Sequence, residues 1–266
     1  MPESGRRRPA WRRIARAALP RVGRGLLTAI VTCLPVAVLA GFAQLRSEPL
    51  QDLDESIIRA ATDVTRDHPL LFDALIIWQE VFQPWRVYVV LIPAAIWAWR
   101  AGLRCRTIWG VSTALVGWNL GLDLKLLVQR ARPVVEDPIS QAPGYSFPSG
   151  HVSNVTMAMA CVLVMVWPLL RRRPPALRAG LVALAATVTI LTALDRILLG
   201  VHYPSDTIAG ALFAVALTTV SWLGYRRTPR SRRLPRAPGH VSTGAGRPGA
   251  GSPRHLTHPP RPGGRR

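Results

Sequence analysis

Residues 25–45, GLLTAIVTCLPVAVLAGFAQL, form a run of 21 residues without a charged side chain. An α-helix rises about 1.5 Å per residue, so a run of this length crosses the hydrocarbon core of a bilayer, which is about 30 Å thick. Arg24 and Arg46 flank the run. The stretch therefore predicts a membrane-spanning helix.

Further apolar runs follow along the 266-residue chain. They cover 87–99 (extended outward by Trp85 and Arg86), 107–122, 152–170, 179–194 and 207–225. With a hydrophobic content of 49% concentrated in such runs, the sequence predicts an all-α fold, a six-span transmembrane helix bundle. The expected parts are a basic N-terminus at 1–24, the six-span domain at 25–225 and a tail at 226–266.

The distribution of charge predicts how the bundle crosses the membrane. The chain carries 34 basic and 14 acidic residues. With the N-terminus inside, the segments 1–24, 100–106, 171–178 and 226–266 are cytoplasmic and hold 26 of the basic residues, but only one acidic residue, Glu3. Since cytoplasmic loops are enriched in Arg and Lys, we expect both termini in the cytoplasm. A cleaved signal peptide at the N-terminus is the alternative for the first run.

Two segments outside the spans have distinct patterns. Residues 51–66 alternate apolar and charged side chains at helical spacing, which predicts an amphipathic helix on the membrane surface. Residues 70–82 are more apolar and are expected to dip into the interface, ending at Pro84. The Gly-, Pro- and Arg-rich tail 226–266 is expected to be disordered and to rest against anionic lipid headgroups.

Ionisable residues gather at the outer ends of the predicted spans. Lys125, the only lysine of the chain, and Arg132 follow the third span. His151 precedes the fourth span, and Arg196 and His202 lie between the fifth and the sixth. Charges near span ends are costly, so their meeting at one membrane depth indicates a functional site.

The residue types in this cluster suit phosphate chemistry. Arginine binds phosphate in a bidentate manner, and lysine supplies a mobile point charge. Gly150 lets backbone amides approach an anion at the start of a helix. Asp206 lies about one helical turn after His202 and would hold one ring nitrogen so that the other can attack. The cluster therefore predicts phosphoryl transfer through a phosphohistidine.

Three ordered motifs give the chain a family resemblance. It resembles the type 2 phosphatidic acid phosphatase (PAP2) superfamily, whose motifs are Lys-x6-Arg-Pro, Pro-Ser-Gly-His and Ser-Arg-x5-His-x3-Asp. The matching residues are Lys125, Arg132 and Pro133, then Pro148–His151, then Arg196, His202 and Asp206. The resemblance covers roughly residues 50–225.

The resemblance implies a role for each matched residue. His202 would be the nucleophile, oriented by Asp206, and His151 would protonate the leaving group. The phosphate would be bound by Lys125, Arg132, Arg196, Ser149 and the amide of Gly150. Neither a metal nor another cofactor is expected.

One residue departs from the motifs, and a second charged residue lies outside them. Asp195 stands where the family usually has Ser, and a carboxylate directed at a phosphate would repel it. We therefore expect Asp195 to pair with Arg196 or another cation, or to be protonated, and to face away from the phosphate. Arg130 lies outside the motifs and is interpreted as an interface anchor or a lipid-headgroup contact.

The sequence thus predicts a metal-independent lipid phosphate or diphosphate phosphatase in the plasma membrane, with its site at the outer leaflet. Undecaprenyl diphosphate, phosphatidic acid and phosphatidylglycerol phosphate are candidate substrates. The resemblance also admits a vanadium haloperoxidase, against which the six spans argue. A non-catalytic membrane protein that binds or transports a lipid phosphate is the alternative function. A nucleic-acid partner is not expected, because the spans conflict with it.

Overall fold

The computed structural model describes residues 10–134 and 139–227, which belong to one compact unit. Within these ranges the regular elements are eight α-helices, with no strand. They are α1 (Ala10–Gln44), α2 (Glu48–Arg66), α3 (Pro69–Val81), α4 (Pro84–Arg100), α5 (Arg104–Val128), α6 (Gly150–Leu170), α7 (Pro175–Leu198) and α8 (Pro204–Arg227). The predicted all-α class is confirmed. The predicted tail lies outside the described residues beyond Arg227.

Five helical segments are long and apolar enough to cross a membrane: Gly25–Gln44, Arg104–Val128, Gly150–Leu170, Pro175–Leu198 and Pro204–Arg226. The helices α3 and α4 meet at a 52° bend and together count as a sixth candidate span. The chain thus has five candidate spans, or up to six with the bent pair, where the sequence predicted six. The difference arises because α4 has only 17 residues and begins at Pro84, where the predicted break after α3 is confirmed.

Local sequence explains where several helices begin. Proline occupies the first turn of α2, α3, α4 and α7. The first turn of a helix has N–H groups without a helical partner, so the missing proline N–H costs nothing there. Helix α5 ends at Val128, and the next residue, Gln129, has a left-handed φ of 51°. The chain therefore leaves the helix directly before Arg130 and Arg132.

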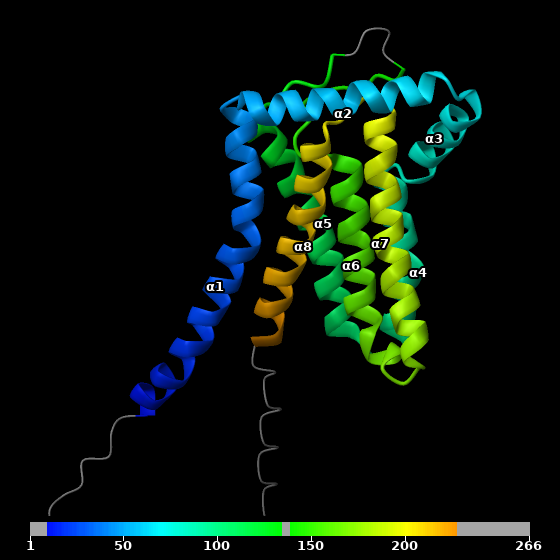
Figure 1. Cartoon of the computed structure of the whole chain (residues 1–266). Helices are drawn as coiled ribbons and strands as arrows, with labels where there is room; N and C mark the ends of the chain where they lie inside the picture. Colours follow the sequence, from blue (N-terminus) through cyan, green and yellow to red (C-terminus); the bar gives the residue numbers. More distant parts are fainter. Residues whose placement is uncertain (1–9, 135–138, 228–266) are drawn as a thin grey trace, which may run out of the picture. The chain divides into compact units, whose positions relative to one another are not determined.

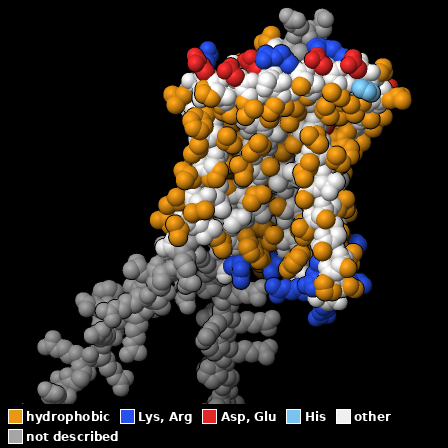
Figure 2. Space-filling view, in the orientation of Figure 1, with side chains coloured by type: hydrophobic (Ala, Val, Ile, Leu, Met, Phe, Trp, Pro, Cys, Tyr) orange, Lys and Arg blue, Asp and Glu red, His pale blue; other side chains and the backbone are white. Residues whose placement is uncertain are grey.

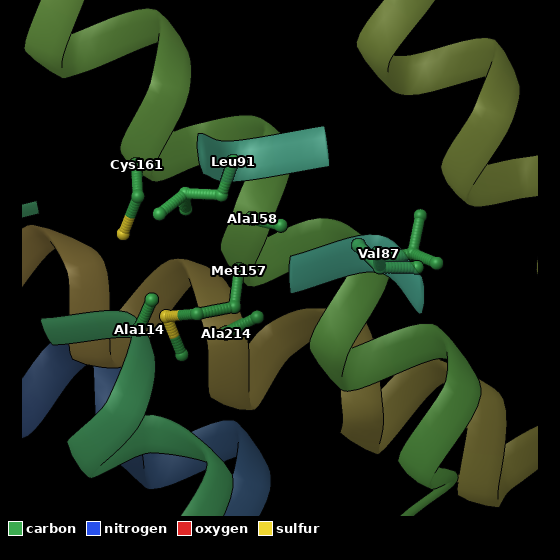
Figure 3. Packing of buried hydrophobic residues seen from close by; sticks show 8 residues of the cluster. Val87, Leu91, Ala114, Met157, Ala158, Cys161 and Ala214 are labelled. Atoms are coloured by element: carbon green, nitrogen blue, oxygen red, sulfur yellow. The ribbon is translucent and has the colours of Figure 1, made fainter. Parts of the chain in front are cut away.

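Helix α6 is the centre of the bundle and packs against α4, α5, α7 and α8. Met157, Ala158 and Cys161 of α6 meet Val87 and Leu91 of α4 in a buried apolar cluster (Figure 3). Ala114 of α5 and Ala214 of α8 complete it. Because small residues let neighbouring helices approach closely, this packing holds α5, α6 and α8 in fixed register.

The contact of α8 with the start of α6 is especially close. A Cβ atom added at Gly210 would lie 2.8 Å from the carbonyl oxygen of Ser149 and 3.3 Å from the amide nitrogen of Ser153. Only glycine permits this approach, since real Cβ atoms are not found so near to backbone. The contact fixes the N-terminus of α6 beside the first turns of α8.

Helix α2 lies across one end of the bundle (Figure 1). Its buried residues Asp54, Ile58, Thr62 and Thr65 follow helical spacing, whereas Leu53, Ile57 and Val64 are exposed. A helix over 51–66 is therefore confirmed, whereas its position on the membrane surface stays a prediction. In Figure 2 the acidic side chains gather at the α2 end, a band of hydrophobic side chains follows, and basic side chains gather at the other end.

Candidate active site

A cavity of about 190 Å³ lies where α5 ends and α6 begins, next to the turn between α7 and α8. Lys125 of α5, His151 of α6, Arg132 and His202 line it, together with Gly150. Pro84, Trp118, Gly121 and Leu122 form an apolar side of the same cavity. Residues from three separate motifs therefore meet in one small space, as the sequence predicted.

His202 sits between a carboxylate and a guanidinium. Its Nδ1 lies 3.6 Å from Oδ2 of Asp206, and its Nε2 lies 3.2 Å from Nη1 of Arg132. A guanidinium can only donate, so Nε2 is the acceptor and the ring proton belongs on Nδ1, toward Asp206. The free electron pair of His202 is therefore on Nε2, the nitrogen on the Arg132 side.

Burial keeps this ring neutral. His202 is 3% exposed. Burial lowers the pKa of His202 to about 4, an effect that Asp206 opposes and that the charges of Arg132 and Lys125 reinforce. At neutral pH the imidazole is therefore uncharged, which is the state that a nucleophilic nitrogen requires.

Lys125 and Arg132 are anchored by neutral carbonyl groups. The Lys125 ammonium donates to the carbonyl of Tyr145 at 2.9 Å. Arg132 donates to the carbonyls of Gly144, Pro143 and Val201 at 3.0, 3.0 and 2.7 Å. Burial lowers the pKa of Arg132, and the charge of Arg196 adds to that effect, whereas Asp206 opposes it. Neither Lys125 nor Arg132 has an ion pair among the salt bridges of the described residues.

Helix α6 begins at the cavity and presents two polar atoms without protein partners. Ser149 Oγ and His151 Nε2 are buried and make no hydrogen bond within the described ranges. The amide of Ser149 donates to the carbonyl of Asp206 at 3.0 Å. This bond joins the Pro-Ser-Gly-His motif to the main chain of Asp206, the residue behind His202. A helix N-terminus next to unpaired polar atoms is suited to an anion.

Arg196 forms a buried ion pair with its neighbour. Its Nε donates to Oδ2 of Asp195 at 2.7 Å, and its Nη2 donates to the same oxygen. The exposed fractions of the two side chains are 2% and 1%. Of the alternatives considered for Asp195, the structure thus has the pairing with Arg196. The carbonyl of Arg196 also accepts the amides of Val201 and His202, which fixes the turn before α8.

Arg130 is not the interface anchor or headgroup contact expected from sequence, because its side chain is 9% exposed and carries two ion pairs. Its Nη1 donates to Oδ1 of Asp206 and its Nη2 donates to Oδ2 of Asp54, both at 2.8 Å. The sequence analysis also treated Asp54 as one of the charged residues of a surface helix and did not identify it as a site residue. The available signal was its position four residues before Ile58, on the buried face of α2.

Not every predicted site residue lines the cavity. Asp206 lies behind His202, and Ser149 and Arg196 are buried next to the lining rather than in it. In the part of the chain that the structure describes, no group of three or more His, Cys, Asp or Glu side chains is placed to hold a metal ion.

Comparison with known proteins finds similarity in the part of the chain that contains these residues. Residues 106–230 match the family model of the PAP2 superfamily. The matched segment is less than half of the chain and is similar to the PAP2 superfamily. The matched range contains all three motifs of the cavity, so the PAP2 resemblance predicted from sequence is confirmed.

One curated PAP2 relative is phosphatidylglycerophosphatase B of Bacillus subtilis (strain 168). It is 28% identical over 128 residues, which cover 46% of this chain and 58% of the relative. The match therefore spans less than two thirds of that protein.

A solved structure extends the likeness in fold. The crystal structure of the first transmembrane PAP2 type phosphatidylglycerolphosphate phosphatase from Bacillus subtilis aligns with a TM-score of 0.66 at 20% identity. The alignment covers 77% of this chain and 99% of that chain. Together with the apolar helices, the shared fold identifies this chain as a multi-pass membrane protein.

Proposed function

We propose that this chain is a PAP2-type phosphatase that hydrolyses a lipid phosphate or diphosphate through a phosphohistidine on His202, without a metal. The observation that carries the proposal is the orientation of His202. Its Nδ1 faces Asp206 at 3.6 Å, and its Nε2 faces Arg132 in a cavity shared with Lys125 and His151. A nucleophile, an orienting carboxylate, cations and a second histidine are the parts that phosphoryl transfer needs.

In the first step, the electron pair on Nε2 of His202 attacks the phosphorus of the lipid phosphate. The Nε2–P bond forms as the bond from phosphorus to the lipid oxygen breaks. His151 donates a proton to the leaving oxygen, so the lipid departs as an alcohol or, from a diphosphate, as a monophosphate. The Nδ1 proton of His202 stays toward Asp206, whose negative charge stabilises the charged ring.

In the second step, water attacks the phosphorus and returns a proton to His151. The Nε2–P bond breaks, which releases inorganic phosphate and restores neutral His202. The charge on the phosphoryl oxygens is balanced in both steps by Lys125 and Arg132. Apart from the contact of Arg132 with His202, their hydrogen bonds go to carbonyls. Ser149 Oγ and the amide of Gly150 would add hydrogen bonds.

Arg196 would contribute to the phosphate site with part of its guanidinium. Two of its nitrogens, Nε and Nη2, are taken by Asp195. Asp195 thereby neutralises part of the charge that the family motif supplies. We propose that Asp195 faces Arg196 and away from the phosphate, and that Nη1 is the donor left for a phosphoryl oxygen.

The substrate would be a lipid phosphate of the outer leaflet of the plasma membrane, with both termini of the chain in the cytoplasm. The apolar side of the cavity at Trp118 and Leu122 suits the first carbons of a lipid chain. Undecaprenyl diphosphate, phosphatidic acid and, from the name of the curated relative, phosphatidylglycerol phosphate are the substrates to compare.

The test is phosphate release from these three lipids by the detergent-purified protein in the presence of EDTA. Wild type should release phosphate, and His202→Ala should lose at least about a thousandfold in kcat. His68→Ala is the matched control, because the His68 side chain is exposed and its ring Nδ1 hydrogen-bonds the carbonyl of Val64. Well-folded wild type that binds the lipids without releasing phosphate would favour a non-catalytic binding protein instead.

A further inference from the structure

A buried carboxylate of the surface helix reaches the residues behind the proposed nucleophile. Asp54 of α2 is 1% exposed, although it lies in a helix with charged neighbours. Its Oδ1 accepts the amide of Ser205 at 3.0 Å, and its Oδ2 accepts both the Ser205 hydroxyl and Nη2 of Arg130. Burying a carboxylate is costly unless it is paired, so these contacts account for its position.

Arg130 connects this carboxylate to Asp206. Its Nη1 donates to Oδ1 of Asp206 at 2.8 Å and to Ser205 Oγ at 2.7 Å. The guanidinium also lies over the ring of Tyr203, 4.2 Å from its centre. The planar guanidinium can therefore hold both carboxylates at once, which a lysine at this position could not do.

The two carboxylate oxygens of Asp206 have different partners. Oδ1 is taken by Arg130, whereas Oδ2 accepts the amide of Tyr203 at 3.1 Å and faces Nδ1 of His202. A carboxylate held by one oxygen cannot rotate freely. Its second oxygen is thus kept near the ring, 3.6 Å from Nδ1 of His202.

We propose that Asp54 and Arg130 are positioning residues for the His202–Asp206 pair: Asp54 fixes Arg130, and Arg130 fixes Asp206 so that Oδ2 stays directed at His202. This inference rests on the proposed function of His202 as a nucleophile. It extends the site from the motif residues to α2, the helix that lies across the end of the bundle (Figure 1).

Charge balance gives Asp54 a second effect. Arg130 alone beside Asp206 would cancel the negative charge that stabilises a positively charged His202 ring. Asp54 neutralises Arg130, so the group of three has a net charge of −1 next to the imidazole. The other charged or titratable groups acting on His202 and His151 are Arg132, Lys125 and Arg196.

This charge balance predicts opposite shifts for two variants. Asp54→Asn removes a negative charge, so the pKa of His202 should fall below its value of about 4. Arg130→Gln removes a positive charge, so the same pKa should rise. The double variant should lie near wild type. A residue with a purely structural role would not produce shifts of opposite sign.

The experiment has two readouts on the full-length protein in detergent. The first is phosphate release: Asp54→Asn and Arg130→Gln should each lower kcat about 10- to 100-fold, with KM changed less than about twofold. The second readout is the rate at which diethyl pyrocarbonate modifies His202. Mass spectrometry measures this rate between pH 3 and pH 8 in steps of about 1 unit, and its pH dependence reports the pKa of His202 in each variant. The second readout does not depend on turnover.

Matched variants separate positioning from folding. Asp52→Asn removes an exposed carboxylate two residues earlier in α2 and should match wild type in both readouts. Ser205→Ala removes only the hydroxyl that Arg130 and Asp54 share, and should lower kcat about threefold. It serves as the test if the charge variants do not fold.

The outcomes are distinct. Lower kcat with opposite shifts at His202 supports the inference. Unchanged kcat, or shifts of the same sign in both variants, overturns it, even if thermal stability falls. If the charge variants do not fold, a Ser205→Ala kcat equal to that of wild type overturns it as well. If wild type releases no phosphate, the proposed function fails, and the modification readout alone decides whether Asp54 and Arg130 set the state of His202.

Discussion

Arg130 and Arg132 are two residues apart, yet the structure gives them opposite surroundings. Arg130 is held between the carboxylates of Asp54 and Asp206, so its charge is neutralised within the protein. Arg132 is held by the carbonyls of Pro143, Gly144 and Val201, which fix its geometry and leave its charge in place. The comparison teaches that the partners of a cation, and not its residue type, indicate how much of its charge is available to a ligand.

The difference follows from electrostatics in a site of low polarity. A carboxylate partner offsets the cost of burying a guanidinium, but it also removes the attraction for a second anion. A carbonyl dipole offsets less of that cost and leaves the attraction intact. Lys125 has the same kind of partners as Arg132, namely the carbonyls of Tyr145 and Ser146.

The largest expected effect is on the binding of a phosphate mimic, and it should differ between Arg132 and Arg130 variants. Arg132→Gln should weaken competitive inhibition by orthovanadate, a phosphate mimic, about 100-fold and lower kcat/KM by a similar factor. Arg130→Gln should leave vanadate inhibition within about twofold of wild type while lowering kcat. Inhibition constants measured for both variants check this. Equal weakening of vanadate in the two would contradict the assignment of Arg132 to the ligand and Arg130 to Asp206.

The second prediction, of intermediate size, concerns how kcat/KM depends on pH. The proposed nucleophile is neutral His202. Burial lowers its pKa to about 4, so kcat/KM should stay high below pH 6.5, the ordinary pKa of histidine. It should fall about tenfold per unit only below about pH 4. The measurement is kcat/KM against pH. The values are corrected for the ionisation of the lipid phosphate, which is measured by ³¹P NMR in the same micelles. A midpoint near 6.5 would show that His202 is not held neutral by its surroundings.

The smallest effect concerns the third arginine. Arg196 resembles Arg130 in having a carboxylate partner, Asp195, but it belongs to a phosphate-binding motif. Asp195→Ser should free Nε and Nη2 of Arg196 and strengthen vanadate inhibition about threefold to tenfold. It should also lower thermal stability in the absence of ligand, because a buried guanidinium then lacks its partner. Weaker vanadate inhibition in Asp195→Ser would mean that Asp195 itself helps to hold the phosphate.

Much of the fold was predictable from local sequence. Apolar runs marked the five segments that the structure makes long membrane helices, since span length depends only on consecutive residues. The bend between α3 and α4 left the sixth span unsettled, because a helix that begins at Pro84 has few residues before Arg100. The motifs identified Lys125, Arg132, His151 and His202, which line one cavity. These residues lie at or beside helix ends that the topology places on the same side of the membrane.

Only the tertiary structure decided which charges pair. Asp54 and Arg130 are 76 residues apart, and Asp54 and Ser205 are 151 residues apart. No local pattern marks such partners, and the charges around Asp54 made it look like part of a solvated face. The sequence by itself determined the helices, the order of the motifs and the chemistry that their residue types allow. Three-dimensional packing determined which cations are neutralised, because ion pairing depends on distances between atoms that the chain brings together only when it folds.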